Sequence, residues 1–368
     1  MIHLFTTNQH THRPNALAHK PASWGKRLWA SICITMLSTL VSLPANAQWK
    51  SYLAYSEPTE IERASGNMIY VLASEGLYSY DTSDQSLQTY DKINALSDCG
   101  IAHIAWCQKA KRLVIVYSNY NIDLLEANGN VVNMADYMNK TMTTDKTVND
   151  IYVDGAYAYL STGFGIVKIN VANGNISDTY QLGFKVNYSY IKDGYLYAAS
   201  MANGMYRAPL TANLLDPNQW TRSGNYVWRK KTMDEELLNI VKTLAPGGPK
   251  TNYCGFLKLY GNKLFSCNGT FDVKPGSIQV LENNTWTIYQ DDIEAITGRR
   301  YQDILAIDVD PKNSNHVMAA GRNGLYEFSN GRFVAYYNNE NSPIQSYNNS
   351  DKEYQMVTGL KYDNDGNL

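Results

Sequence analysis

The stretch "AYAYLSTGFGIVKINVANG", residues 156–174, decides the fold, because two β-rich runs flank a glycine-containing turn and an Asn-Gly turn closes the stretch. Another turn signal, Asp154-Gly155, comes directly before it, so that a hairpin leads into the stretch. Aromatic and β-branched residues are suited to a pleated, half-buried surface. The stretch therefore predicts consecutive antiparallel strands joined by tight turns.

The same layout occurs six times along the chain. Its anchor residue opens the third strand of each repeat, and the anchors are Gly76, Asn121, Gly165, Gly204, Gly276 and Gly324. Their spacings of 45, 44, 39, 72 and 48 residues, apart from the fourth, match the period of a four-stranded propeller blade. Aromatic outer strands end the repeats, at residues 87–90, 219–224, 284–290 and 332–337. The sequence predicts an all-β, seven-bladed β-propeller of four-stranded blades, with the last blade truncated.

The first 47 residues have the features of an export signal. Lys26 and Arg27 precede an apolar core at residues 28–43, and Ala45-Asn46-Ala47 forms a small-x-small cleavage pattern. We expect a signal peptide at 1–47 and a propeller at 48–368, with six complete blades and the start of a seventh. No later run is apolar enough to span a bilayer, so we expect an exported protein without a transmembrane span.

The two ends of the mature chain make separate predictions. Residues 48–55 match the outer-strand pattern, and we expect them to complete the last blade and close the ring. At the other end, residues 354–368 read as the first strand and turn of the seventh blade. "DNDGN" within this stretch lacks the ligands of a calcium loop, so we expect a turn there. We expect the chain to be a fragment of a longer protein.

The 72-residue spacing indicates an insertion at about residues 225–252. Within it, residues 232–244 read as a helix with Thr232 as N-cap and Glu235 in a capping box. The basic-aromatic run before this helix is our candidate partner-binding site, consisting of Trp228, Arg229, Lys230 and Lys231. The alternative is a solvated basic turn beside a helix that only packs on the propeller.

The residues give no support for catalysis, and we expect neither an enzyme nor a cofactor nor a metal site. Only His103 and His316 follow the export signal, in different repeats, and we expect His103 to be a hydrogen-bonded structural histidine. The carboxylates weighed as glycosidase candidates are Asp291, Asp292 and Glu294, or Asp308 and Asp310, and each group fits a turn better. The remaining cysteines are expected to be buried free thiols: Cys99, Cys107, Cys254 and Cys267.

The charge balance excludes one class of partner. Without residues 1–47 the chain has 28 basic and 34 acidic residues, a net charge of about −6. A general binder of nucleic acid needs a basic footprint, which this composition lacks.

Several motifs in order resemble the N-terminal β-propeller of the PorZ family, in the type IX secretion system of Bacteroidetes. The motifs are "WKSYLAY" (49–55), "NALSDCGIAHIAW" (94–106), "LVIVYSNYNIDLL" (113–125), "GFGIVKIN" (163–170), "DTYQLG" (178–183) and "APGGPKTN" (245–252). More distantly, Gly-Leu-Tyr at 76–78 and 324–326 resembles the propeller repeat of two-component regulators.

The resemblance implies a non-enzymatic scaffold at the cell surface, peripheral to the outer membrane. Its implied partners are the sortase-like PorU, the barrel PorV, and PorQ, in a complex that processes cargo and attaches it to anionic lipopolysaccharide. The family implies a second propeller and a small C-terminal β-domain, which this sequence does not contain. The alternative is a periplasmic ligand-sensing propeller of a hybrid two-component histidine kinase.

Overall fold

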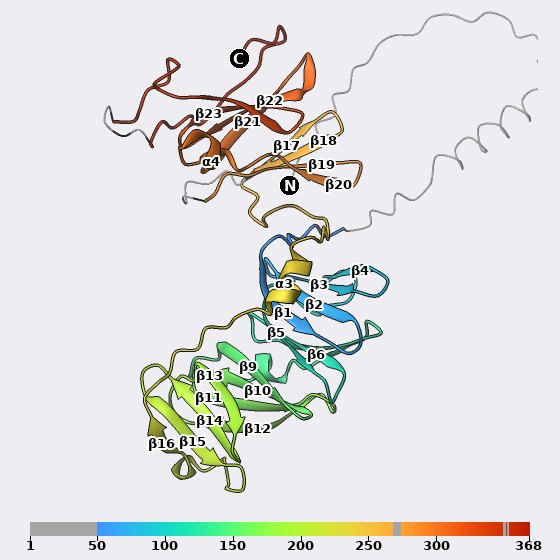
Figure 1. The fold of residues 1–368 in the computed structure, drawn as a ribbon, viewed down its shortest axis with the longest axis vertical. Coiled ribbons are helices and arrows are strands. Elements are labelled where there is room, and N and C mark those ends of the chain that lie inside the picture. Colours follow the sequence, from blue (N-terminus) through green and yellow to red (C-terminus); the bar gives the residue numbers. More distant parts are fainter. Residues whose placement is uncertain (1–49, 268–273, 349–350, 352) are drawn as a thin grey trace, which may run out of the picture. The chain divides into compact units, whose positions relative to one another are not determined.

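Six four-stranded antiparallel sheets make up the computed structural model, which describes residues 50–267, 274–348, 351 and 353–368 (Figure 1). In every sheet the four strands lie side by side in chain order. The strands of the first three sheets are β1 Pro58–Arg63, β2 Met68–Ala73, β3 Gly76–Asp81, β4 Leu87–Tyr90, β5 Ile101–Cys107, β6 Arg112–Tyr117, β7 Ile122–Glu126, β8 Val131–Asn133, β9 Val148–Asp154, β10 Tyr157–Thr162, β11 Gly165–Asn170 and β12 Asn175–Gln181. Those of the other three are β13 Tyr188–Lys192, β14 Tyr195–Ser200, β15 Gly204–Pro209, β16 Thr221–Gly224, β17 Phe256–Tyr260, β18 Lys263–Cys267, β19 Ile278–Glu282, β20 Thr285–Ile288, β21 Ile304–Asp310, β22 Asn313–Gly321, β23 Gly324–Ser329 and β24 Arg332–Tyr337.

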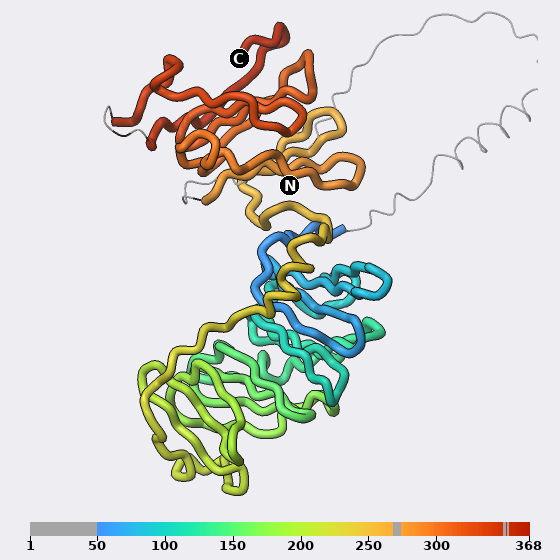
Figure 2. The backbone as a smooth tube through the Cα atoms, in the orientation of Figure 1, coloured from blue at the N-terminus to red at the C-terminus, as the bar shows by residue number. Residues whose placement is uncertain are grey.

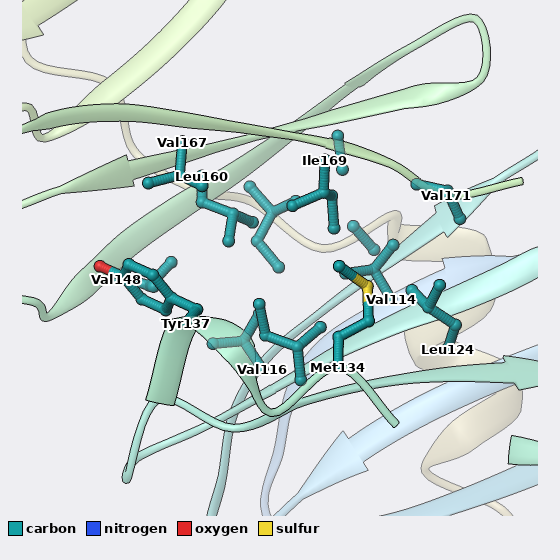
Figure 3. Close-up of a cluster of buried hydrophobic side chains, with 14 of the residues drawn as sticks. Val114, Val116, Leu124, Met134, Tyr137, Val148, Leu160, Val167, Ile169 and Val171 are labelled. Atoms are coloured by element: carbon teal, nitrogen blue, oxygen red, sulfur yellow. The ribbon is translucent and has the colours of Figure 1, made fainter. Parts of the chain in front are cut away.

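The first four sheets pack face to face in succession, and the fifth sheet packs on the sixth, in the manner of propeller blades. The first strands of the first four sheets, β1, β5, β9 and β13, contact one another in succession. Buried side chains fill the space between neighbouring sheets; Figure 3 shows Val116, Leu160 and Ile169 pointing toward one another between the second and third sheets. A further core joins the fifth and sixth sheets. This arrangement confirms an all-β propeller of four-stranded blades, while the total of seven blades stays a prediction.

The anchor glycines mark a close approach between strands. Gly204 opens β15 with φ of +93°, and a Cβ on it would lie 2.6 Å from the backbone oxygen of Gly224 in β16. Only glycine adopts this backbone region without strain and leaves room for the neighbouring strand. The repeated glycine at the start of the third strand therefore has a steric origin.

The helices are short, and one differs from its prediction. They are α2 Asp136–Asn139, the 3₁₀ turn η1 Pro217–Gln219, α3 Glu235–Val241 and α4 Ile293–Thr297. The prediction that Thr232 caps a helix over residues 232–244 was wrong, because the Asp234 carboxylate accepts hydrogen bonds from the amides of Glu236 and Leu237 and starts α3 there. Leu237 and Val241 pack on the first sheet, as their apolar spacing predicted.

The predictions for the two ends of the described chain are confirmed only in part. Residues 50–57 form no strand, so the predicted closing strand was wrong; Tyr52 instead packs edge-on against Trp286 of the fifth sheet at 5.6 Å. At the other end, residues 354–361 form no strand, so the predicted first strand of a seventh blade was wrong, whereas the predicted turn is present, because the amide of Asp363 donates to the carbonyl of Asn367 over 2.9 Å. The predicted signal peptide at 1–47 lies outside the described residues.

The four cysteines of the described chain are free thiols, as predicted, but their predicted burial is confirmed only for Cys107 and Cys267 and was wrong for Cys99 and Cys254, which are exposed. In the described part of the chain, the helices are all too short or too polar to cross a membrane.

Candidate functional site: an ion-pair cluster on the inner strands

Residues 225–234, which we call the connecting segment, join the fourth sheet to α3. Figure 2 shows this segment running from the fourth sheet back to the first. On its way it contacts β13, β9 and β1 in turn, through Val227, Arg229 and Lys231. The segment therefore ties together inner strands that are far apart in the sequence.

Arg229 is the first charged anchor of the connecting segment. Its guanidinium donates to Asp150 Oδ2 of β9 over 2.7 Å and lies 4.4 Å from the ring centroid of Tyr188 in β13. The Tyr188 hydroxyl in turn donates to the carbonyl of Val227 over 2.6 Å. A guanidinium that pairs with a buried carboxylate and stacks on an aromatic ring is held in one orientation.

Lys231 is the second charged anchor. Its ammonium donates to Glu60 Oε1 of β1 over 2.6 Å. His103 Nδ1 lies 2.8 Å from the same oxygen. The backbone amide of Ile104 donates a hydrogen bond to the other oxygen, Glu60 Oε2, over 2.7 Å. Glu62, two residues along β1, accepts the amide of Trp106 at 3.1 Å. The two glutamates thus satisfy backbone donors on the open edge of β5, which would otherwise be available for pairing with another chain.

The pKa values of the three carboxylates near the connecting segment, Glu60, Glu62 and Asp150, are shifted in different directions. Burial opposes ionisation of Glu60, but the hydrogen bond from His103 and the positive charge of Lys231 outweigh it and lower the pKa of Glu60. Burial raises the pKa of Glu62, although it accepts the amide of Trp106. Burial also raises the pKa of Asp150, despite the nearby charge of Arg229. Neutralisation by the connecting segment is therefore most complete at Glu60.

The structure divides the four predicted site residues into two pairs. Arg229 and Lys231 point to carboxylates of the inner strands. Trp228 is 66% exposed, and Lys230 is also exposed. Neighbouring side chains of an extended segment point in opposite directions, which explains the alternation. Arg229 and Lys231 are thus bound to inner-strand carboxylates but keep 42% and 46% of their side chains exposed, beside the exposed Trp228 and Lys230.

Sequence reasoning missed the inner-strand carboxylates Glu60 and Asp150. Their signal was weak, since an acidic residue in an alternating strand is usually solvent-exposed. The prediction for His103 was confirmed, because both its ring nitrogens are engaged, Nε2 with the carbonyl of Val148 at 3.2 Å.

Three of the carboxylates considered as catalytic candidates form ion pairs or hydrogen bonds with other residues of the chain. Asp291 pairs with Lys250, and Asp308 pairs with Lys258 and accepts the amide of Tyr362 over 2.7 Å. Asp310 lies 3.1 Å from His316. Among the described residues no group of three or more His, Cys, Asp or Glu side chains is arranged to hold a metal ion.

Comparison with solved structures supports the propeller architecture. PorZ from Porphyromonas gingivalis, described as an essential bacterial surface component of the type IX secretion system, matches with a TM-score of 0.72 and 20% identity. The match covers 86% of this chain and 56% of the PorZ chain. The extracellular domain of a putative hybrid two-component system from B. thetaiotaomicron matches with a TM-score of 0.36 and 13% identity over 80% of this chain and 42% of that chain, which is too low to carry an argument.

A match to a protein family covers part of the chain. No match was found among the curated proteins. The family described as "TSS9, PorZ, N-terminal beta-propeller domain" matches residues 69–221, which form most of the first four sheets. The resemblance of this chain to the PorZ N-terminal β-propeller is thereby confirmed, by the family match over these residues and by the fold over most of the chain.

Proposed function

We propose that this chain acts as a PorZ-like component of the type IX secretion system, a non-catalytic binding and scaffold subunit at the outer face of the cell. The observation that carries the proposal is the match of residues 69–221 to the PorZ propeller family, together with the PorZ-like fold. Its partners would be the sortase-like PorU, PorV and PorQ, and its role would be to support processing of cargo and attachment to anionic lipopolysaccharide.

The chemistry of the cluster supports binding rather than catalysis. Glu60 and Asp150 are held by Lys231 and Arg229, and His103 has both ring nitrogens engaged. A general acid or base needs a group that is free to exchange a proton with a substrate. The connecting segment instead exposes Trp228, an aromatic residue of a type enriched at protein interfaces, and Lys230, whose positive charge would attract an anionic partner.

Affinity purification from outer-membrane extracts tests the scaffold role. A tagged copy should recover a sortase-like protein, and recovery of no secretion-system component would refute the proposal.

A pair of variants tests the outward surface separately. Trp228→Ser combined with Lys230→Glu should reduce the recovered partner at least tenfold, while the melting temperature stays within the error of the wild type. Lys109→Glu, at an exposed lysine in the turn after β5, is the matched control and should recover as much partner as the wild type. Equal recovery with all three proteins would place the partner contact elsewhere on the chain.

A further inference from the structure

The connecting segment is held to the inner strands by side chains rather than by its backbone. Within the described chain, residues 225–233 make no hydrogen bond from backbone to backbone with any strand. The contacts of the segment with the sheets are the ion pairs of Arg229 and Lys231 and the hydrogen bond from the Tyr188 hydroxyl to the carbonyl of Val227. A segment attached in this way can leave the surface without disrupting a sheet.

The two ion pairs differ in how many groups support each carboxylate. Three groups surround the carboxylate of Glu60, which are the Lys231 ammonium, the His103 ring and a backbone amide. The nearly buried carboxylate of Asp150 accepts from Arg229, and no other hydrogen bond to it occurs among the described residues. Donors and positive charges keep a buried carboxylate ionised. Asp150 therefore depends on one side chain for what Glu60 receives from three groups.

The groups that face Asp150 come from three neighbouring elements. Arg229 and Lys231 face it from the connecting segment, and His103 faces it from β5. All three favour the ionised carboxylate when they are positively charged. Tyr188 of β13, on which Arg229 stacks, has a raised pKa and is neutral in acid. Acidification therefore changes the charge of Asp150 itself without removing a cation from its surroundings.

The order in which the carboxylates take up protons follows from these surroundings. Burial outweighs the nearby positive charges at Asp150 and raises its pKa, whereas the pKa of Glu60 is lowered. Glu62 also has a raised pKa, but among the described ion pairs it joins neither basic residue of the segment. As pH falls, Asp150 is therefore neutralised before Glu60, and the two ion pairs are lost one after the other.

Neutral Asp150 would hold Arg229 less tightly. Hydrogen bonds in which a partner is ionised are roughly twice as strong as those between neutral groups. The stack of Arg229 on Tyr188 would remain, and the pair of Lys231 with Glu60 would still fix the far end of the segment. The part of the segment before Lys231 then gains freedom while both of its ends stay attached.

We propose that the connecting segment is a pH-sensitive latch that opens when Asp150 is protonated. Opening loosens Arg229 and leaves Lys231 bound, so that Trp228, which is held in one position at neutral pH, becomes mobile in acid. A surface that is already ordered binds a partner more tightly than a mobile one, because less conformational entropy is lost on binding. The latch would thus regulate the outward surface of the proposed function, and only this consequence rests on that function.

Electron paramagnetic resonance of a spin label on the segment tests the latch. The label is attached to Lys230→Cys in a chain that also carries Cys99→Ser and Cys254→Ser, because these two thiols are exposed. The mobile fraction of the label should rise at least threefold as pH falls from about 7 to about 4, where an aspartate with a raised pKa is more than half protonated.

Two variants of the labelled chain identify the titrating group. Asp150→Asn, which imitates the protonated carboxyl, should give the mobile spectrum already at neutral pH and should show no further change in acid. Asp154→Asn, at an exposed position of the same strand, is the matched control and should follow the unsubstituted labelled chain. If Asp150→Asn melts well below that chain, Arg229→Gln takes its place, because it removes the same ion pair from a side chain that is 42% exposed.

Either of two results would overturn the latch. They are a label whose mobility does not change with pH, and a change with pH that persists in Asp150→Asn. Partner recovery by Asp150→Asn at neutral pH, measured as above, should fall at least threefold. If no bait recovers a partner, the proposed function fails while the spectra still decide the latch. If recovery is normal and the spectra do not depend on pH, the latch fails and the proposed function stands.

Discussion

Lys231 Nζ lies 2.6 Å from Glu60 Oε1, although the two residues are 171 positions apart in the sequence. The carboxylate is 6% exposed and belongs to the first strand of the first sheet. The pair thus fixes the end of the connecting segment to the sheet on which α3 packs. Without it, a buried carboxylate would lose one of its hydrogen-bond donors.

Lys231→Ala should lower the free energy of unfolding by about 1–2 kcal/mol, because a nearly buried carboxylate loses a donor while His103 and the Ile104 amide remain. Lys230→Ala should change it by less than about 0.5 kcal/mol, since that side chain is exposed. Urea titration of both variants gives the comparison. Equal effects would mean that the pair with Glu60 contributes nothing to stability.

Arg229 and Asp150 should be energetically coupled. A double-mutant cycle with Arg229→Ala and Asp150→Asn should give a coupling of about 0.5–3 kcal/mol, because the two side chains are joined over 2.7 Å and Asp150 is 5% exposed. The single variants and the double variant are compared by chemical denaturation. Strictly additive effects would show that Arg229 acts only through its contact with Tyr188.

His316 should make the stability depend on pH. Burial opposes its protonation, but hydrogen bonds to Asp310 and Glu327 outweigh burial and raise the pKa of His316. The folded state then binds the proton more tightly than the unfolded state, whose histidine titrates at about 6.5. The contribution is fully present below that pH and is lost as pH rises through the raised pKa.

Denaturation of the wild type and of His316→Gln at a series of pH values checks this sign. The wild type should lose stability as pH rises above about 6.5, the value of an unperturbed histidine, and the variant should show a flatter profile. A wild-type stability that increases with pH in this range would contradict the prediction.

Gly204→Ala should lower the free energy of unfolding by about 1–3 kcal/mol, because the new Cβ would lie 2.6 Å from the backbone oxygen of Gly224 at a φ of +93°. Gly359→Ala is the control, since a Cβ added there would have no atom within 4 Å. Thermal unfolding should separate the two variants clearly. A neutral Gly204→Ala would remove the steric explanation of the anchor glycines.

Leu160→Ala should lower the free energy of unfolding by about 2–5 kcal/mol, because it leaves a cavity in the core between the second and third sheets. Val334→Ala should cost less than about 0.5 kcal/mol, since that side chain is 53% exposed. Denaturant midpoints at low protein concentration measure both. A small effect of Leu160→Ala would mean that these two sheets do not share a close-packed core.

The repeat could be predicted because its signals are local. The turn at Asp193-Gly194 joins β13 to β14, and Gly261-Asn262 joins β17 to β18, each between the strands that the sequence indicated. Turn residues and β-rich runs act over a few positions, so they can be read without knowledge of the fold. The outer strands with Trp286 and Phe333 were found in the same way.

The site could be predicted only in part. The run with Trp228, Arg229, Lys230 and Lys231 was recognised by composition, but its division into inward and outward pairs was not. That division depends on Glu60 and Asp150, which the chain brings to the segment from two other sheets. Likewise, the position of residues 50–57 beside Trp286 depends on a contact across more than two hundred residues.

The sequence by itself determined the repeating hairpins, the glycine at the start of the third strand and the resemblance to PorZ, because each is encoded in neighbouring residues. Only the tertiary structure decided that Lys231 is bound to Glu60 and that Arg229 is bound to Asp150. The physical reason is that ion pairing and burial depend on which surfaces meet, and residues far apart in the chain supply those surfaces.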